Sequence, residues 1–287
     1  MSWQLVARRP LPGGSEQGGT WIVEWTSTSV MGIVNVTPDS FSDGGRHLHV
    51  DDAVAWGRRM FADGALVVDV GGESTRPGAD PVDVETELER VVPVVGSLVS
   101  DGAGLVSIDT RSSTVAEAAI DAGAHLVNDV GGLGDPAMLE LCARTGTPAV
   151  IVHMQGTPTT MQLDPTYDDV VSEVASFLRR RAGAALAAGV PSVLVDPGIG
   201  FGKTVAHNLE LLGALPLVDD LPVLVGASRK GFIGSITGVE QADHRDPGSL
   251  AVHLHAAQHA VAMVRAHDVA GHVQALGVSA RLRPGGH

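Results

Sequence analysis

The residues of this sequence that could do chemistry stand directly after short apolar runs. Eight such runs are followed by Asn35; Asp69; Asp109; Asn128 and Asp129; His153; Asp196; Ser228, Arg229 and Lys230; and Arg265 with His267. Any single Asp or Asn in such a place could cap the next helix or turn. Capping alone would put Ser, Thr or Gly at several of these places. Carboxylates and amides, with cations after the last two runs, instead favour a neutral polar heterocycle that carries an anionic group.

Two glycine-rich loops follow the second and the sixth apolar run. Residues 71–78 let backbone amides approach a ligand and place Arg76 to reach an anion. Residues 196–204 are similar to a phosphate loop, but they are one residue short of the G-x-x-x-x-G-K-[ST] spacing. The second segment is therefore expected to form a tight strand–helix loop that presents Asp196 and Phe201.

Cations and histidines gather in the last third of the chain. Residues 228–230 open a predicted helix, so backbone N–H groups, a hydroxyl and an ammonium converge there, and Lys230 is the main candidate cation of an anion site. His253, His255 and His259 share the next predicted helix, 248–260. No acidic partner accompanies them, so we expect surface or interface groups there rather than a metal site.

Eight apolar runs predict the strands that position these groups. They are residues 30–34, 66–70, 105–108, 125–127, 149–152, 192–195, 222–225 and 261–264. Segments with helical periodicity alternate with them: 51–63, 84–100, 113–122, 136–145, 168–188, 206–215, 229–236, 248–260 and 267–276. Strands that are apolar throughout are buried on both faces and therefore parallel. The alternation predicts one α/β domain, a (β/α)8 TIM barrel whose active site lies at the carboxyl ends of the strands, with a doubly wound open sheet as the alternative.

Residues 1–29 differ from the rest of the chain. Trp3, Trp21 and Trp25 flank a glycine-rich turn over residues 12–19, so residues 3–6 and 21–25 could pair as a hairpin. We expect this short N-terminal β-hairpin to cap the bottom of the barrel and to take no part in chemistry. The catalytic barrel is predicted over 30–280 and a C-terminal tail over 281–287.

Composition and charge exclude several classes of function. The net charge of −14 argues against nucleic acid, because phosphate neutralisation needs a basic face. No apolar run approaches the ~20 residues of a membrane span, so no membrane partner is expected. Arg8 and Arg9 are followed by Pro, Gly, Ser and Glu rather than by an apolar segment, which predicts a cytoplasmic protein.

The segments at these strand ends resemble motifs of the dihydropteroate synthase family. The segments are 35–45 (NVTPDSFSDGG), 69–78 (DVGGESTRPG), 107–110, 128–129, 153–156 (HMQG), 196–203, 228–230 and 265–268 (RAHD). The resemblance runs from residue 30 to about residue 277. It implies a pterin-binding TIM barrel that joins 4-aminobenzoate to dihydropterin diphosphate, giving dihydropteroate and diphosphate with Mg²⁺. It also implies competition by sulfonamides and a homodimer, for which helix 248–260 could serve as a surface.

The resemblance implies a role for each matching residue. The pterin ligands would be Asp109, Asn128, Met154, Asp196 and Lys230. The 4-aminobenzoate pocket and a mobile lid would use Phe41, Thr75, Arg76, Pro77, Phe201 and Ser228. Diphosphate would meet Asn35, Arg265 and His267, and the metal would meet Asn35 and Asp43. Catalysis would rest on Asp109, Lys230, Arg265 and His267, which stabilise the charges formed when the C–O bond breaks early.

Two other functions use a similar barrel. A pterin-binding methyltransferase domain passes a methyl group to a corrinoid protein, and it does not need Phe41, Asp43 or the Arg76–Pro77 pair, all present here. A non-catalytic pterin-binding paralogue would be expected to have lost Lys230, Arg76 or the cations after the last strand. None of these is lost.

Overall fold

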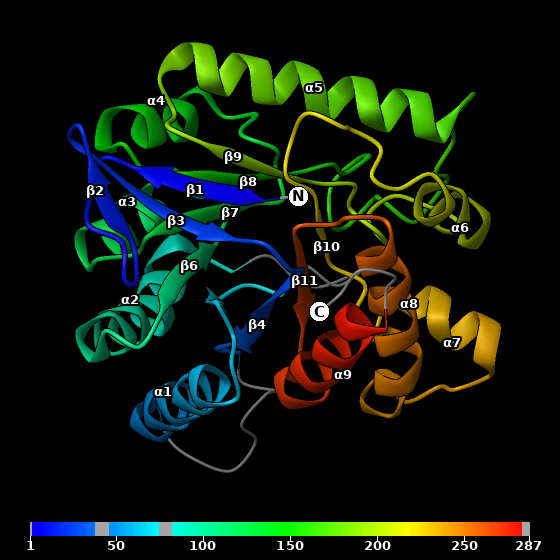
Figure 1. The fold of residues 1–287 in the computed structure, drawn as a ribbon, viewed down its shortest axis with the longest axis horizontal. Helices are drawn as coiled ribbons and strands as arrows, with labels where there is room; N and C mark the ends of the chain where they lie inside the picture. Colours follow the sequence, from blue (N-terminus) through cyan, green and yellow to red (C-terminus); the bar gives the residue numbers. More distant parts are fainter. Residues whose placement is uncertain (1, 38–45, 75–81, 283–287) are drawn as a thin grey trace.

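Eight parallel strands form the centre of the fold in the computed structural model, which describes residues 2–37, 46–74 and 82–282 (Figure 1). They are β4 (Ser29–Asn35), β5 (Val67–Gly71), β6 (Leu105–Asp109), β7 (Leu126–Asp129), β8 (Ala149–Val152), β9 (Val193–Asp196), β10 (Leu224–Val225) and β11 (Met263–Ala266). Their order is β10-β11-β4-β5-β6-β7-β8-β9. A parallel bridge between Val195 and Val223 joins the two ends of this sheet, so the sheet closes into a barrel.

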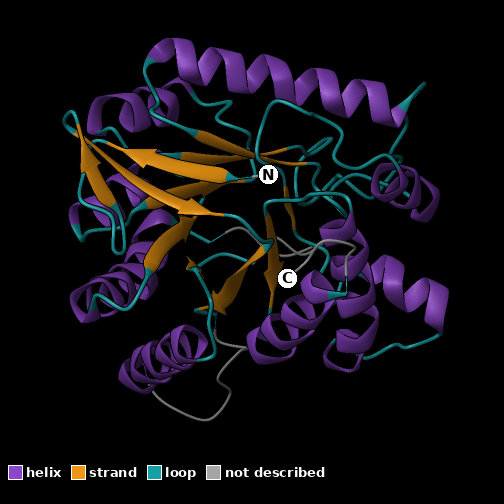
Figure 2. Ribbon diagram, in the orientation of Figure 1, coloured by secondary structure: helices purple, strands orange, loops and turns teal. Residues whose placement is uncertain are grey.

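Helices surround the barrel on the outside (Figure 2). The described residues contain α1 (Arg46–Ala62), α2 (Val84–Asp101), α3 (Ser113–Asp121), α4 (Pro136–Thr145), α5 (Val170–Ala188), α6 (Val205–Gly213), α7 (Gly231–Thr237), α8 (Asp246–Gln258) and α9 (Val269–Arg281). The predicted (β/α)8 barrel is therefore confirmed, and the open doubly wound sheet is excluded by the closure of the sheet.

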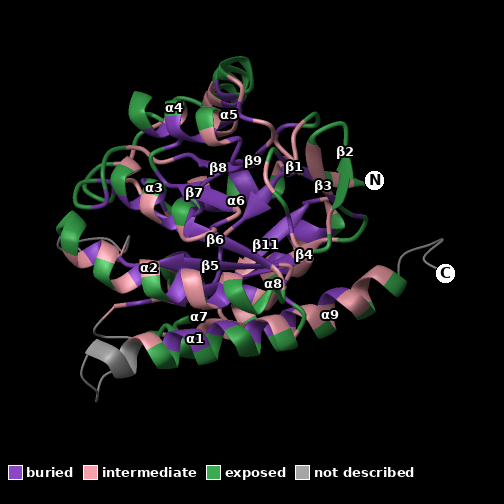
Figure 3. Cartoon of the chain, turned by 90° about the vertical axis from the view of Figure 1, so that its left-hand side faces the viewer, coloured by how far each residue is buried: buried purple, intermediate pink, exposed green. Residues whose placement is uncertain are grey.

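Two apolar clusters explain why the strands are buried throughout (Figure 3). Side chains alternate between the two faces of a strand. One set points into the barrel and forms a single cluster that includes Met31, Val67, Leu105, Leu126, Leu194 and Met263. The other set packs under the helices, for example Val68, Val106 and Val127 with Val94, Leu98 and Ala119. A polar residue placed an even number of positions after an inward apolar residue must therefore point into the barrel.

Helix caps fix where each loop ends. Asp83, Ser112, Asp135 and Asp169 accept hydrogen bonds from backbone N–H groups in the first turns of α2, α3, α4 and α5. Asp268 does the same for α9, at 3.0 Å from the N–H of Gly271. This cap immediately follows His267, so it sets the turn between β11 and α9.

The N-terminal residues form a small antiparallel sheet of β1 (Trp3–Ala7), β2 (Ser15–Gln17) and β3 (Thr20–Trp25). β1 pairs with β3 as predicted, but β2 lies inside the segment expected to be only a turn. The sequence predicts one long turn over residues 12–19. Gly18 and Gly19 both have positive φ, which permits a shorter, tight turn between β2 and β3.

This sheet packs against the amino ends of the barrel strands. Leu5, Val23 and Trp25 join the cluster inside the barrel. The indole Nε1 of Trp25 donates to the carbonyl of Ala262 at 2.9 Å, just before β11. Among the helices of the described residues, none is long and apolar enough to cross a membrane.

Candidate active site

Arg265 organises the carboxyl end of the barrel. Its Nε donates to Asp69 Oδ2 at 2.6 Å, and its Nη2 donates to Asp109 Oδ2 at 2.7 Å. Arg265 belongs to β11, so its side chain reaches past β4 to the ends of β5 and β6. The guanidinium thus holds two carboxylates from neighbouring strands inside the barrel.

The alternation of strand faces decides which polar residues reach this centre. Asp69, Asp109, Asn128, Asp196 and Arg265 each lie two or four positions after an inward apolar residue, so they point into the barrel. Asp129 lies an odd number of positions after Leu126. Its carboxylate accepts from the N–H groups of Gly131 at 2.6 Å and Leu133 at 2.8 Å, so it shapes the following turn instead of the site.

Asp69 and Asn128 form a buried pair. Asn128 Nδ2 donates to Asp69 Oδ2 at 2.8 Å. Asn128 is 3% exposed and Asp69 is 0% exposed. Within the part of the chain that the structure describes, Asp69 Oδ1 and Asn128 Oδ1 are buried without a hydrogen-bond partner. A buried acceptor without a partner costs ~1–3 kcal/mol, so these two oxygens are suited to a ligand that donates hydrogen bonds. The sequence pattern places Asp69 at a strand end without indicating a ligand role for it.

Two further carboxylates lie at strand ends, Asp109 on β6 and Asp196 on β9. Burial is the largest influence on Asp109 and raises its pKa, outweighing the attraction of Arg265, and the nearby Asp69 raises it further. Burial also raises the pKa of Asp196 to about 6, although the Gly198 N–H and the Lys230 ammonium favour the charged form. The Gly198 N–H donates to Asp196 Oδ1 at 2.7 Å. Both carboxylates are thus held in fixed places but are costly to ionise.

Lys230 and Phe201 lie together on the loops after β10 and β9. The Lys230 Nζ is 3.7 Å from the centroid of the Phe201 ring, a cation–π contact. Burial, and after it the nearby Arg265 charge, lower the pKa of Lys230 to about 8. The ammonium is therefore poorly solvated, and an anionic or electron-rich ligand would stabilise it.

Ser228 and His267 meet across two loops. The Ser228 Oγ lies 2.9 Å from His267 Nδ1, and the backbone N–H of His267 donates to the same Oγ at 3.2 Å. A serine hydroxyl has one proton and two acceptor lone pairs, so the Oγ accepts this N–H and still forms a hydrogen bond with Nδ1 in either tautomer of the ring. This arrangement fixes the imidazole plane of His267 beside the end of β11.

His153 and Lys203 support the loop after β9. Lys203 Nζ lies 2.9 Å from His153 Nδ1 and donates to the Phe201 carbonyl at 2.9 Å. Burial, with the Lys203 charge second, lowers the pKa of His153 to about 3. The His153 imidazole is therefore neutral and holds the loop that presents Phe201, in agreement with the rejection of a phosphate loop.

Arg229 and His253 do not lie where the sequence predicts them. Arg229 turns away and forms an ion pair with Asp246 at 2.7 Å. The expectation that His253 is a surface or interface group is wrong, since it is fully buried. His255 and His259 are half-buried on the same helix. Helical spacing alone did not reveal that α9 covers the His253 side of α8.

The remaining predicted site residues divide into two groups. Asn35 is half-buried at the end of β4, opposite Gly71 of β5, and Met154 is half-buried and packs against the apolar cluster inside the barrel. The other predicted ligands lie outside the described residues: Phe41, Asp43, Thr75, Arg76 and Pro77.

Few side chains of the described residues could bind a magnesium ion directly. The described residues contain no group of three or more His, Cys, Asp or Glu side chains that could hold a metal. Mg²⁺, however, keeps several waters and is commonly held by one or two protein oxygens together with substrate phosphates. The amide oxygen of Asn35 at the mouth of the barrel fits that mode of binding.

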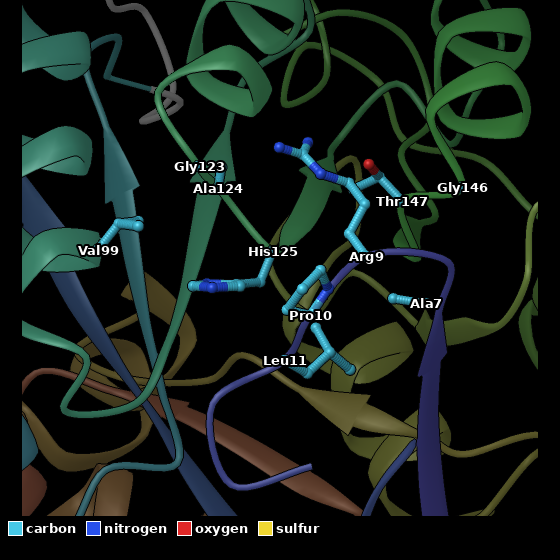
Figure 4. Close-up of a pocket in the computed structure, with 10 residues that line it drawn as sticks. All are labelled: Ala7, Arg9, Pro10, Leu11, Val99, Gly123, Ala124, His125, Gly146 and Thr147. Atoms are coloured by element: carbon cyan, nitrogen blue, oxygen red, sulfur yellow. The ribbon is translucent and has the colours of Figure 1, made fainter. Parts of the chain in front are cut away.

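A cavity of about 240 Å³ lies at the opposite end of the molecule (Figure 4). Its lining includes Arg9, Leu11, His125 and Thr147. Arg9 donates to the Ile120 carbonyl at 2.9 Å, and burial lowers the pKa of His125 to about 4. These groups join the N-terminal segment to the amino ends of the strands, far from Asp69, Asn128 and Arg265 at the carboxyl ends.

Comparison with known proteins agrees with this geometry. Residues 31–267 match the family described as pterin binding enzyme. The dihydropteroate synthase of Escherichia coli K12 is 46% identical over 253 residues, which cover 87% of this chain and 89% of that protein. A structure of the Xanthomonas albilineans dihydropteroate synthase with 4-aminobenzoic acid superposes with a TM-score of 0.86 at 48% identity, covering 92% and 96% of the two chains.

A second structure of the Xanthomonas albilineans enzyme, in complex with 7,8-dihydropteroate, has a TM-score of 0.82 at 45% identity. It covers 92% of this chain and 97% of that one. The similarity therefore spans the whole barrel, including every strand end described above. The chain belongs to the pterin-binding enzymes and, within them, to the dihydropteroate synthase family.

Proposed function

We propose that this protein is a transferase that condenses (7,8-dihydropterin-6-yl)methyl diphosphate with 4-aminobenzoate, giving 7,8-dihydropteroate and diphosphate for folate biosynthesis. The observation that carries the proposal is the pair of buried acceptors, Asp69 Oδ1 and Asn128 Oδ1, beside carboxylates held by Arg265. An aminopyrimidinone ring offers N–H donors on one edge. Such a ring would donate hydrogen bonds to these two oxygens at the carboxyl ends of the barrel strands.

The pterin would be held from several strands. Asn128 and Asp196 would read its donor edge together with Asp69, and Asp109 would lie beside the bond that breaks. Met154 would pack on one face of the ring, since it is half-buried against the inner apolar cluster. The poorly solvated ammonium of Lys230 would contact the electron-rich side of the pterin ring, which would stabilise its charge.

The anionic substrates would occupy the side of the site nearer α7 and α9. Arg265 and His267 would bind the diphosphate with the Asn35 amide, while Ser228, Phe201, Lys230 and Thr75 would frame 4-aminobenzoate. When bound, Mg²⁺ would supply additional positive charge at the diphosphate, with Asn35 and Asp43 as its protein ligands. The global charge of −14 makes these local cations necessary for binding two anions.

The reaction would begin with cleavage of the C–O bond between the pterin methylene and the diphosphate. The bonding electrons leave with the diphosphate oxygen, whose charge Arg265 and His267 stabilise, while Asp109 stabilises the pterin cation. The amine nitrogen of 4-aminobenzoate then forms the new C–N bond and loses a proton. Phe41, Asp43, Arg76 and Pro77 would form a lid that excludes water, which would otherwise capture the cation.

One assay tests the proposal. Purified protein is incubated with the pterin diphosphate, isotope-labelled 4-aminobenzoate and Mg²⁺, and labelled dihydropteroate is measured. Formation of the labelled product excludes both a non-catalytic paralogue and a methyltransferase. Absence of product at concentrations where calorimetry shows both ligands bound would refute the function.

Finer features of the protein are part of the same proposal. Mg²⁺ dependence is tested by chelation and by restoring the metal, and sulfonamides are expected to compete with 4-aminobenzoate. Light scattering tests a homodimer and fractionation a cytoplasmic location. Residues 1–29 would act as a cap, 30–280 as the catalytic barrel and 281–287 as a tail.

A further inference from the structure

Two histidines lie behind the loops that carry Ser228 and His267. His253 comes from α8 and His272 from α9, and both are 0% exposed. Nδ1 of His253 is 2.8 Å from Nε2 of His272, and the two ring centroids are 4.9 Å apart. Neither histidine belongs to the segments that resemble family motifs, and neither has a role in the proposed reaction.

The direction of hydrogen bonding through this pair follows from its two ends. The backbone N–H of Ala227 donates to His253 Nε2 at 3.2 Å. Because a backbone N–H can only donate, Nε2 is the acceptor and the neutral His253 ring carries its proton on Nδ1. That proton is directed at Nε2 of His272, so His272 also carries its proton on Nδ1. The His272 Nδ1 lies 2.6 Å from the Asp268 carbonyl, which accepts it.

This chain of bonds requires both imidazoles to be neutral. A second proton on either ring would set two N–H donors against each other in a place that water does not reach. Burial is the main cause that lowers the pKa of His253 and of His272, and it outweighs the opposite influence of Asp268 and Asp246 on His272. The pair therefore acts as an uncharged connector between a backbone donor and a backbone acceptor.

The two ends of the connector are next to proposed ligand residues. Ala227 precedes Ser228, and Asp268 follows His267, whose side chain meets the Ser228 Oγ at 2.9 Å. The same two loops are thus fastened at two points, once at the site and once behind it. We propose that His253 and His272 are positioning residues that set the spacing between Ser228 and His267. This inference rests on the proposed function, in which these residues meet the two anionic substrates.

If the two histidines only filled space, any side chains of the same volume could replace them. A primary amide, by contrast, presents one acceptor and one donor on one planar group, as a neutral imidazole does. His272→Gln can therefore accept from His253 Nδ1 and donate to the Asp268 carbonyl, whereas His272→Leu can do neither. His255→Leu is a matched control, because His255 lies on the same helix but bonds the Leu212 carbonyl at 3.0 Å, away from both loops.

The test compares kcat and KM for both substrates in these variants, together with their melting temperatures. We expect His272→Leu to lower kcat/KM about tenfold through misplacement of the two loops, while His272→Gln stays within about twofold of the unaltered enzyme. The His255→Leu variant should have a lower melting temperature and an unchanged kcat/KM. A folded His272→Leu variant with unchanged kcat/KM would overturn the proposal, as would equal losses in the Gln and Leu variants.

A second measurement needs no variant that might unfold. Nuclear magnetic resonance of the intact protein, prepared with isotope-labelled histidine, reports which ring nitrogen of each imidazole carries the proton. The proposal requires the Nδ1–H form for both His253 and His272 at neutral pH, and the Nε2–H form or a doubly protonated ring in either one contradicts it. If the condensation assay fails but this result holds, the proposed function is wrong while the connector stands.

Discussion

Asn128 donates a hydrogen bond across strand β6 to Asp69, from Nδ2 to Oδ2 at 2.8 Å. The bond leaves one oxygen of each side chain buried without a partner among the described residues. The second bond to Asp69 Oδ2 comes from Arg265 at 2.6 Å, so this oxygen is saturated while Oδ1 remains an acceptor for a ligand. We therefore expect the pair to act as a preformed hydrogen-bond template for a ligand rather than as a structural cap.

Asp69→Asn tests this template. The new carbonyl can still accept from Asn128 and Arg265, but that turns the amide N–H₂ toward the ligand, where it opposes the donor edge of the pterin. Calorimetric pterin affinity should fall about 10- to 100-fold, since a mismatched buried polar group costs ~1–3 kcal/mol. Asp101→Asn, an exposed carboxylate paired with Arg58 at 2.7 Å, is the control. Equal affinity in the two variants would rule the template out.

Asp109→Asn separates stabilisation of the cation from folding. The amide oxygen can still accept from Arg265 Nη2, so the melting temperature should change little. Loss of the negative charge beside the developing pterin cation should lower kcat about 10²- to 10³-fold. Turnover and circular dichroism check the two halves of this prediction, and near-normal kcat would remove Asp109 from the mechanism.

Lys230→Ala should weaken binding of both substrates. The ammonium lies 3.7 Å from the Phe201 ring in a half-buried residue, so removing it takes a poorly solvated charge out of the site. We expect roughly a tenfold increase in the Kd of each substrate, the loss of about one charge-assisted contact. Arg144→Ala, at an exposed ion pair with Glu117, should leave both values unchanged. A Lys230→Ala variant that binds each substrate normally would identify the lysine as a solvated group.

The barrel was predictable because its local signals agree with the closed sheet. Runs such as 105–108 and 149–152 are apolar without alternation, and the structure buries every residue of β6 and β8. Polar strand ends were visible as well. The parity rule could also have separated inward Asn128 from outward Asp129, because it needs only the position of Leu126 relative to them.

Other features depend on contacts between distant segments. β2 forms inside a glycine-rich segment because β3 offers it an edge, which no property of residues 15–17 reveals. The burial of His253 depends on its neighbour His272, which lies 19 residues later in the chain. The unpaired oxygen of Asp69 follows from how Arg265 and Asn128 share the other oxygen. Each is a property of tertiary packing rather than of local pattern.

Trp25→Phe tests how the N-terminal sheet is attached to the barrel. The indole N–H donates to the Ala262 carbonyl at 2.9 Å in a buried place, and phenylalanine leaves that carbonyl without this donor. The free energy of unfolding should fall by ~1–2 kcal/mol from the lost bond and the smaller ring. KM for both substrates should stay constant, because the site lies at the other end of the strands. Chemical denaturation and steady-state kinetics check this, and a changed KM would contradict the separation of the two ends.

Asp196→Asn should make the protein more stable at neutral pH and less able to bind pterin. Burial raises the pKa of Asp196 from its ordinary value of 3.8 to about 6 in the folded state. Between these values the folded state binds more protons than the unfolded chain, so the stability associated with this group falls as pH rises from about 4 to about 6. The charged carboxylate then costs the fold about 3 kcal/mol at pH 7 by this linkage.

The asparagine carbonyl can still accept from Gly198, so the variant avoids this cost while keeping the loop. Melting temperatures of the two proteins should therefore lie close together near pH 4 and diverge in favour of the variant between pH 4 and pH 7. Asp101→Asn, whose carboxylate is exposed, should show no such divergence. A pH-independent difference between Asp196→Asn and the unaltered protein would mean that Asp196 is ionised at little cost. If the divergence is found together with weaker pterin binding, the buried carboxylate is kept for recognition at the expense of stability.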